Sequence, residues 1–269
     1  MIPDPEKVRV WEARAPAYDR LCRRWEIFSQ LSNHLIDLLP ASLQGPVLDI
    51  GAGAGLTSKI LLARYPYCQA ILIEPSEAML DIARANLAGR PAKFLAMGLD
   101  RAAEHDLHAV AALASASMQF LDLEPAFATL ARIIAPGGYV AFNLWWHHWE
   151  ETAKRAMEGW RDVAESVCRE AQLPLHVLPS RTPIPKTRIE LTNASRRHGF
   201  ELLSEHRDEY PTPIGFGVDF QAMEPNWPVK GCAPEVREAL LTRIHELAQG
   251  KLEPLVSTRF LLQRTTEGR

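Results

Sequence analysis

The stretch "VLDIGAGAGLTSKILL", Val47 to Leu62, decides the fold class of this chain. Its apolar beginning predicts a buried strand, and the spacing of the later apolar residues predicts a helix over Leu56 to Tyr65. Between them stand Gly51, Gly53 and Gly55, where backbone without side chains can turn sharply and approach a ligand. A glycine turn between a strand and a helix indicates an α/β sheet with a ligand at its carboxyl edge.

Strand and helix patterns alternate as far as Trp149, which predicts a parallel sheet with helices on both faces. The predicted strands are Pro46 to Ile50, Ala70 to Glu74, Lys93 to Met97, Asp106 to Ser115 and Tyr139 to Trp145. After Trp149 the regular alternation of strand and helix patterns ends. The later predictions are a helix over Glu150 to Ala171, a helix ending at Gly199 with a strand after it, an irregular aromatic insertion from Tyr210 to Trp227, a helix over Pro234 to Gln249 and a strand over Leu255 to Arg264.

Composition favours a single domain with a small-molecule partner. The chain has 269 residues, and 33 acidic against 30 basic residues give a formal charge of −3. This balance offers no excess of positive charge for binding nucleic acid or an anionic membrane. The start of the sequence is mixed and charged rather than basic and then apolar, and no run of about 18 apolar residues is present, so neither an export signal nor a membrane span is expected. The four cysteines are scattered, which predicts a cytoplasmic protein with no disulfide framework and no metal site. We expect a monomer or homodimer.

The glycine spacing argues against a dinucleotide. A nicotinamide-binding turn has the pattern G-x-G-x-x-G, whereas here the third glycine comes one residue early and the bulky Leu56 follows it. A nicotinamide-dependent oxidoreductase is therefore disfavoured. Glu74 stands at the tip of the second predicted strand, 74 − 51 = 23 positions after Gly51, where a carboxylate can accept both hydroxyl protons of a ribose.

Four segments, "VLDIGAGAG", "ILIEPSEAMLDIARANL", "SASMQFLD" and "LARIIAPGGYVAFN", resemble the class I S-adenosylmethionine-dependent methyltransferases, in their small-molecule methyltransferase 11/25 branch. "WEARAPAYD", Trp11 to Asp19, is similar to the N-terminal helix of that branch. The resemblance implies a Rossmann-like, seven-stranded, mostly parallel sheet with an antiparallel last strand and a small lid. The implied single domain has a helical lid (1–40), a cofactor-binding core (41–149) and a substrate side (150–269).

The resemblance also implies an activity and a set of cofactor residues. The activity is methyl transfer from S-adenosylmethionine to an O, N, S or C atom of a small, apolar metabolite; the alternative is a protein of the same fold that binds this cofactor for a non-methylating reaction such as cyclisation. Where the family commonly has Gly-Asp after the third strand, this chain reads "AMGLDR", with Gly98 at the position of the acid. The implied cofactor residues are Asp49, Gly51, Gly53 and Gly55 at the methionine part, Glu74 at the ribose, Pro75 and Met79 at the adenine, Gly98 and Leu99 after the third strand, Ser115 beside the cofactor, and Tyr18 on the N-terminal helix above it.

Two groups of residues are candidates for the acceptor site: polar residues that could act on the acceptor, and aromatic residues that could form its pocket. His147 and His148 follow the fifth predicted strand and could serve as a general base toward a hydroxyl or amine acceptor; alternatively, both simply begin the next helix. "SxxxQF", Ser115 to Phe120, is similar to a motif of relatives that methylate carboxylates, which makes Gln119 a candidate. The aromatic candidates for an apolar acceptor pocket, with plain core packing as the alternative, are Trp11, Trp145, Trp146, Tyr210, Phe216 and Trp227.

Overall fold

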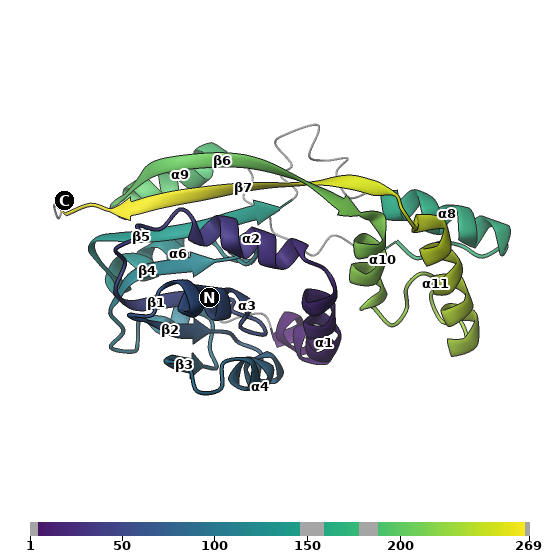
Figure 1. Cartoon of the computed structure of the whole chain (residues 1–269), viewed down its shortest axis with the longest axis horizontal. Coiled ribbons are helices and arrows are strands. Elements are labelled where there is room, and N and C mark those ends of the chain that lie inside the picture. Colours follow the sequence, from purple (N-terminus) through teal and green to yellow (C-terminus); the bar gives the residue numbers. More distant parts are fainter. Residues whose placement is uncertain (1–4, 146–158, 178–187, 267–269) are drawn as a thin grey trace.

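The structure is a computed structural model, and it describes residues 5–145, 159–177 and 188–266. Its centre is a seven-stranded sheet with the order β3-β2-β1-β4-β5-β7-β6 (Figure 1). The strands are β1 (Gly45–Ile50), β2 (Cys68–Ile73), β3 (Ala92–Leu95), β4 (Ala109–Ala114), β5 (Ile134–Trp145), β6 (Phe200–Pro213) and β7 (Leu252–Arg264). Neighbours from β3 to β5 pair in parallel, and β7 runs antiparallel to both β5 and β6. The predicted fold class, with its reversed last strand, is confirmed.

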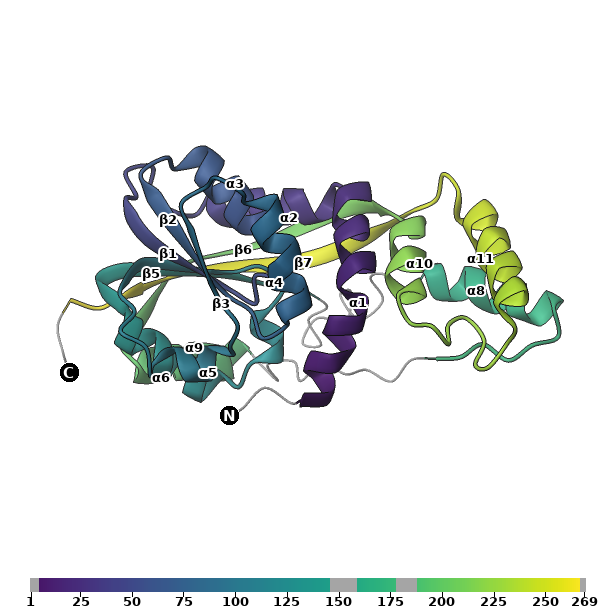
Figure 2. The same cartoon turned by 90° about the horizontal axis from the view of Figure 1, so that it is seen from below.

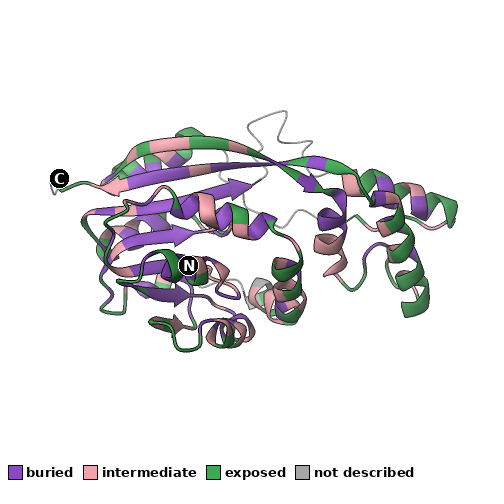
Figure 3. Cartoon of the chain, in the orientation of Figure 1, coloured by how far each residue is buried: buried purple, intermediate pink, exposed green. Residues whose placement is uncertain are grey.

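Helices cover both faces of the sheet (Figure 2). One face carries α2 (Ile27–Ile36), α3 (Leu56–Arg64) and α4 (Glu77–Asn86); the other carries α5 (Leu99–Ala102), α6 (Leu123–Ile133) and α9 (Arg188–Arg197). Successive strand residues point to opposite faces, so that Val47 of β1 packs with the α3 side and Leu48 packs with the α6 side. The strands at the centre of the sheet are buried on both faces, as Figure 3 shows.

The last two strands extend beyond the rest of the sheet and carry a further group of helices. Residues Leu252–Val256 of β7 pair with Glu209–Pro213 of β6, past the last pair between β7 and β5. At the end of this two-stranded arm lie α8 (Gly159–Glu170), α10 (Ile214–Ala222) and α11 (Pro234–Ala248) (Figure 1). These three helices enclose a hydrophobic cluster of their own, which we call the helical cap.

The N-terminal helices connect the sheet to the helical cap. Helix α1 (Pro5–Arg24) packs against α4 and α10. Asp219 of α10 joins three elements, because it accepts a hydrogen bond from Trp25 Nε1 at 2.8 Å and pairs with Arg24 at 3.1 Å and His245 of α11 at 3.0 Å. The side chain of Asp219 is only 14% exposed, so that the junction between α1 and α2 is fixed to the helical cap.

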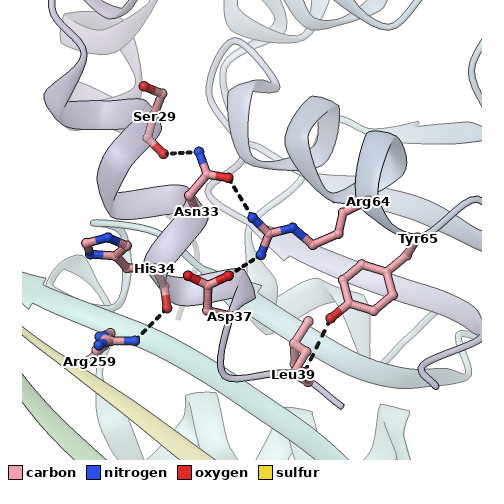
Figure 4. A network of polar contacts seen from close by, with 8 residues as sticks. All are labelled: Ser29, Asn33, His34, Asp37, Leu39, Arg64, Tyr65 and Arg259. Atoms are coloured by element: carbon pink, nitrogen blue, oxygen red, sulfur yellow. Dashed lines mark hydrogen bonds and ion pairs between the residues drawn. The ribbon is translucent and has the colours of Figure 1, made fainter. Parts of the chain in front are cut away.

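A second polar network fixes α2 to the sheet (Figure 4). Asn33 donates to the carbonyl oxygen of Ser29 at 2.8 Å and accepts from Arg64 of α3, also at 2.8 Å. On the other side of the helix, Arg259 of β7 donates to the carbonyl oxygen of His34 at 2.9 Å. These bonds pin α2 between α3 and the most C-terminal strand.

The segment from Tyr210 to Trp227 differs from its prediction. It is regular as far as Ala222, because its first residues end β6 and the next form helix α10. Pro211 and Pro213 favoured an irregular loop, but β6 lies at the edge of the sheet, where a proline is tolerated because the missing N–H needs no partner strand. Gly217 allows the side chain of Trp160 to approach α10 closely, since a Cβ there would lie 2.7 Å from Trp160 Cδ1.

Candidate functional site

A cavity of about 320 Å³ opens at the carboxyl edge of the sheet, where β1, β2 and β4 end. This volume is in the range of small-molecule sites. Its walls come from α1, α2, the turns after the parallel strands, and α10. The lining residues include Trp11, Tyr18, Phe28, Gly51, Gly53, Glu74, Pro75, Ser76, Met79, Gly98, Leu99, Asp100, Ser115, Ala116, Ser117, Gln119, Phe120, Asp122, Trp145 and Phe220.

The glycine turn after β1 forms the floor of this cavity. All three of its glycines have positive φ angles, a conformation that costs a residue with a Cβ about 1 to 2 kcal/mol. A Cβ on Gly51 would also lie 2.6 Å from the Cβ of Ser117, so no side chain fits there. Gly55 has a different role: a Cβ there would lie 3.1 Å from both Ala83 Cβ and Leu87 Cδ1, so its absence lets the start of α3 pack closely against α4.

Glu74 presents a fixed carboxylate to the cavity. Its two oxygens accept hydrogen bonds from the backbone N–H groups of Gly53 at 3.0 Å and Ser76 at 2.9 Å, and the residue is only 8% exposed. Burial raises the pKa of Glu74 above its ordinary value, although both backbone bonds oppose that rise. Each carboxylate oxygen has a second lone pair for a ligand hydroxyl.

Asp49 lies behind the glycine turn instead of in the cavity wall. It is 1% exposed, and its Oδ2 accepts hydrogen bonds from the backbone N–H of Ser58 at 3.0 Å and from the Ser58 hydroxyl at 2.6 Å. Burial raises its pKa to about 6, although both Ser58 bonds oppose that rise. Asp49 therefore joins the end of β1 to the first turn of α3, whose N–H groups have no partner within the helix.

The turn after β4 forms another wall, and its backbone is strained. Ala116 has a φ of 53°, which is uncommon for a residue with a side chain. Asn143 of β5 holds this conformation, because its Oδ1 accepts a hydrogen bond from the Ala116 N–H at 2.6 Å. The hydroxyl of Ser117 donates to the carbonyl oxygen of Ile50. These two bonds fix the turn after β4 beside the glycine turn.

Five rings form a continuous wall along the cavity, here called the aromatic wall: Phe120, Trp11, Tyr18, Phe28 and Trp145. Consecutive ring centroids are 6.3, 5.5, 5.5 and 5.5 Å apart, within the distances at which aromatic pairs attract. Burial, with Cys22, Glu74 and Asp49 nearby, raises the pKa of Tyr18 well above its ordinary value. The Tyr18 phenol therefore stays protonated at neutral pH.

Residues that follow β2 and residues that follow β3 form a further part of the cavity lining. Pro75 and Met79 line it from the start of α4, and Gly98 and Leu99 line it from the start of α5. Asp100 also lines the cavity, so an acidic group is present although Gly98 occupies the usual position of the acid. This part of the lining therefore combines the apolar residues Met79 and Leu99 with one acidic residue, Asp100.

The structure brings most of the predicted site residues together, but not all of them. Tyr210 and Phe216 belong to a core cluster behind the aromatic wall, where the hydroxyl of Tyr210 lies 2.8 Å from His34 Nδ1 and Phe216 packs on Phe28. Trp227 is fully buried in the helical cap. These three residues, together with Asp49 and Gly55, do not appear among the lining residues. Trp146, His147 and His148 lie outside the described residues.

Several lining residues were not found from the sequence. Phe28 comes from α2 and Phe220 from α10, and no local pattern distinguishes either from a core residue. Ser117 had a usable signal, because it closely follows a predicted strand, and carboxyl ends of parallel strands face one crevice. No three His, Cys, Asp or Glu side chains in the described part of the chain are placed to hold a metal ion. Among the described helices, none is long and apolar enough to cross a membrane.

Comparison with known proteins identifies a protein family that matches part of this chain. Residues 47–138 match the model of the methyltransferase domain family. The chain carries a methyltransferase domain. The match begins in β1 and ends in β5, so the glycine turn, Glu74 and the turn after β4 all lie inside the methyltransferase domain. The resemblance inferred from the sequence motifs is thereby confirmed.

Relatives and solved structures agree with this assignment. A trans-aconitate 2-methyltransferase of Acidovorax sp. (strain JS42) is 36% identical over 102 residues, a match that covers 36% of this chain and spans only 37% of the relative. A demethylmenaquinone methyltransferase of Chlamydia pneumoniae is 27% identical over 140 residues, which cover 50% of this chain and 59% of the relative. A geranyl diphosphate C-methyltransferase from Streptomyces coelicolor A3(2), in complex with Mg²⁺, geranyl diphosphate and S-adenosyl-L-homocysteine, is similar in fold, with a TM-score of 0.51 and 12% identity over 88% of this chain and 78% of that chain.

Proposed function

We propose that this protein transfers a methyl group from S-adenosylmethionine to a small molecule. The observation that carries the proposal is the Glu74 carboxylate, which the backbone N–H groups of Gly53 and Ser76 hold at the cavity. A carboxylate fixed beside a glycine turn suits the two hydroxyls of a ribose. The match of this segment to the methyltransferase domain family supports the same function.

The cavity also suits the other parts of S-adenosylmethionine. The apolar lining residues Met79 and Leu99 suit the flat adenine, and the carboxylate of Asp100, which lines the same cavity, suits the adenine amino group. Glycine at position 51 lets the turn after β1 lie directly against Ser117, and we assign the methionine part to the cavity over this turn. We assign Ser115 and Tyr18 to the walls on either side of it. No basic residue is needed for these contacts.

The reaction would depend mainly on positioning. When bound, S-adenosylmethionine supplies a methyl group that is already activated by the adjoining positively charged sulfur. The chain would then have to hold an acceptor atom in line with the methyl group and exclude water, and such positioning can supply a large share of the rate. The aromatic wall provides the apolar surface for both tasks. Whether His147 or His148 acts as a base toward a hydroxyl or amine acceptor remains a proposal, to be tested by the pH dependence of kcat in His→Ala variants.

Binding of S-adenosyl-L-homocysteine, the demethylated product, tests this function without an identified acceptor. The ligand should raise the melting temperature of the protein, as any ligand of the native state does, and calorimetry should give a 1:1 complex. Glu74→Ala should weaken binding by roughly 1 to 3 kcal/mol, because the ribose hydroxyls lose a buried partner. Glu104→Ala is the matched control, since that side chain is 68% exposed. Binding of NADH and not of S-adenosyl-L-homocysteine would refute the proposal.

Two further expectations belong to the same proposal. A reducing compartment, the cytoplasm, suits a chain whose four cysteines are all unpaired. A monomer or homodimer is the expected state in solution, which light scattering during size-exclusion chromatography measures directly.

A further inference from the structure

The turn between β4 and the short helix η1 (Met118–Phe120) contains a backbone conformation that needs a cause. Among the described residues, two with a side chain have a positive φ angle, Gln172 at 57° and Ala116 at 53°. Gln172 is exposed and follows the end of α8, where such a conformation commonly ends a helix. Ala116 instead follows a strand and lines the cavity. Strained backbone of this kind persists only where its surroundings hold it, and it is most frequent at functional sites.

Asn143 of β5 provides the hold on Ala116. Its Oδ1 accepts the hydrogen bond from the Ala116 N–H at 2.6 Å. Asn143 is only 1% exposed and does not appear among the lining residues, so a ligand in the cavity meets Ala116 and not Asn143. The left-handed conformation disfavours alanine roughly tenfold, a factor that one hydrogen bond of ordinary strength can offset.

The held conformation joins the turn after β4 to two walls of the cavity. Ser117 lies so close to the glycine turn that a Cβ on Gly51 would be 2.6 Å from the Ser117 Cβ. The Ser117 hydroxyl donates to the carbonyl oxygen of Ile50, the last residue of β1. On its other side, Ala116 packs against the cluster that contains Trp145. One turn therefore contacts both the floor of the cavity and the aromatic wall.

We infer that Asn143 is a positioning residue for cofactor binding, which acts through Ala116 to keep Ser115 and Ser117 beside the cofactor. This inference rests on the proposed function and adds to it a residue that does not touch the ligand. Without the Asn143 amide oxygen, alanine at position 116 would favour a negative φ angle, and the turn after β4 would leave the glycine turn. Glycine at position 116 would keep the turn in place, because a φ angle near 53° costs glycine no steric penalty.

A double-mutant cycle with S-adenosyl-L-homocysteine as the probe tests the inference. The unaltered protein, Asn143→Leu, Ala116→Gly and the double variant are each titrated by calorimetry as full-length chains. Asn143→Leu keeps a similar volume and removes the amide oxygen. We expect it to weaken binding about tenfold, because only the fraction of molecules with the turn in place can bind. In the Ala116→Gly background, the same substitution should weaken binding less than about threefold, since glycine needs no support.

Gln172→Gly is the matched control. It removes the positive φ angle of a residue with a side chain at an exposed position that does not appear among the lining residues. It therefore relieves backbone strain without touching the turn after β4. In this background Asn143→Leu should still weaken binding about tenfold. Asn143→Ser, which also removes the amide oxygen, is titrated as a second variant, and urea denaturation establishes that each protein is folded.

Four results would overturn the inference. Unchanged affinity in both Asn143→Leu and Asn143→Ser would show that the cofactor site does not need this hydrogen bond. An equal loss of affinity with and without Ala116→Gly would show that Asn143 acts by another route. Rescue by Gln172→Gly would assign the effect to general stability, and unfolding of both Asn143 variants that Ala116→Gly does not prevent would assign Asn143 to the core.

Each of these results leaves the proposed function intact, because the unaltered protein is titrated first. Failure of that first titration would instead refute the proposed function, and this inference with it.

Discussion

Replacing Asp49 with asparagine should remove a pH dependence from the stability of the fold. Asp49 is fully enclosed, and burial raises the pKa of its carboxyl from 3.8 to about 6 despite two hydrogen bonds from Ser58. The folded protein therefore holds this proton more tightly than the unfolded chain does. The free energy of unfolding is then highest below about pH 4, and it falls as the pH rises from about 4 to about 6.

The pKa gives the size of this effect. Between 3.8 and about 6, at 1.36 kcal/mol for each unit of pKa, the ionised carboxylate costs the fold about 3 kcal/mol at neutral pH. About 1.4 kcal/mol of that loss falls between pH 5 and pH 7.5. Glu74 contributes a dependence of the same sign, since burial raises its pKa as well. Only the difference between the unaltered protein and Asp49→Asn isolates Asp49.

Urea denaturation at a series of pH values measures the effect. The unaltered protein should lose about 1.4 kcal/mol more between pH 5 and pH 7.5 than Asp49→Asn loses. A constant offset between the two proteins is expected from the new amide and carries no information. Asp106→Asn is the matched control, because the Asp106 side chain is 95% exposed. Equal slopes for the unaltered protein and Asp49→Asn would show that the Asp49 carboxyl is not the buried acid inferred from the structure.

Three further predictions follow from packing and hydrogen bonding. Gly51→Ala should lower the melting temperature and abolish binding of S-adenosyl-L-homocysteine, because its Cβ would lie 2.6 Å from Ser117 Cβ; normal binding in calorimetry would contradict the close contact. Trp227→Ala should cost about 3 to 5 kcal/mol in urea denaturation and leave the affinity for S-adenosyl-L-homocysteine unchanged, whereas a selective loss of acceptor affinity would place Trp227 at the site. Asp219→Ala should cost about 1 to 3 kcal/mol, since the indole N–H of Trp25 loses its partner; an unchanged melting temperature would show that this junction does not hold the helical cap.

The parallel half of the fold could be predicted from the sequence because its strands are buried on both faces. Strands β1 and β4 are continuous apolar runs, and the predicted boundaries differ from the observed ones by a few residues at most. The edge strand β6 could not be followed to its end. The end of the strand alternates between exposed and buried residues, but the polar Thr212 takes a buried position and prolines flank it, so hydrophobicity gave no period-2 signal there. Helix α10 has apolar residues all round and two glycines, a composition that does not favour a helix.

The candidate site also has one part that the sequence predicts and one part that it does not. Glu74 and the glycines could be found because they directly follow strands, and the order of strands determines which turns meet. The aromatic wall depends on tertiary contacts: Trp11 and Tyr18 come from α1, Phe28 from α2 and Trp145 from β5. Nothing local distinguishes Phe28, which lines the cavity, from Phe216, which packs behind it. The packing of α10 against α1 and α8 makes this distinction, and these are contacts between elements far apart in the sequence.

The position of β7 affects how the chain can fold during synthesis. This strand follows the other described strands in the sequence, yet it lies between β5 and β6, and its Arg259 donates a hydrogen bond to the carbonyl oxygen of His34, 225 positions earlier. Until it emerges, β5 ends in an open edge, β6 has no neighbour in the sheet, and α2 lacks one of its anchors. Unpaired edges of this kind readily join other chains. Completion of the thirteen-residue strand β7 therefore closes two open sheet edges at once, which a sheet assembled in sequence order would not require.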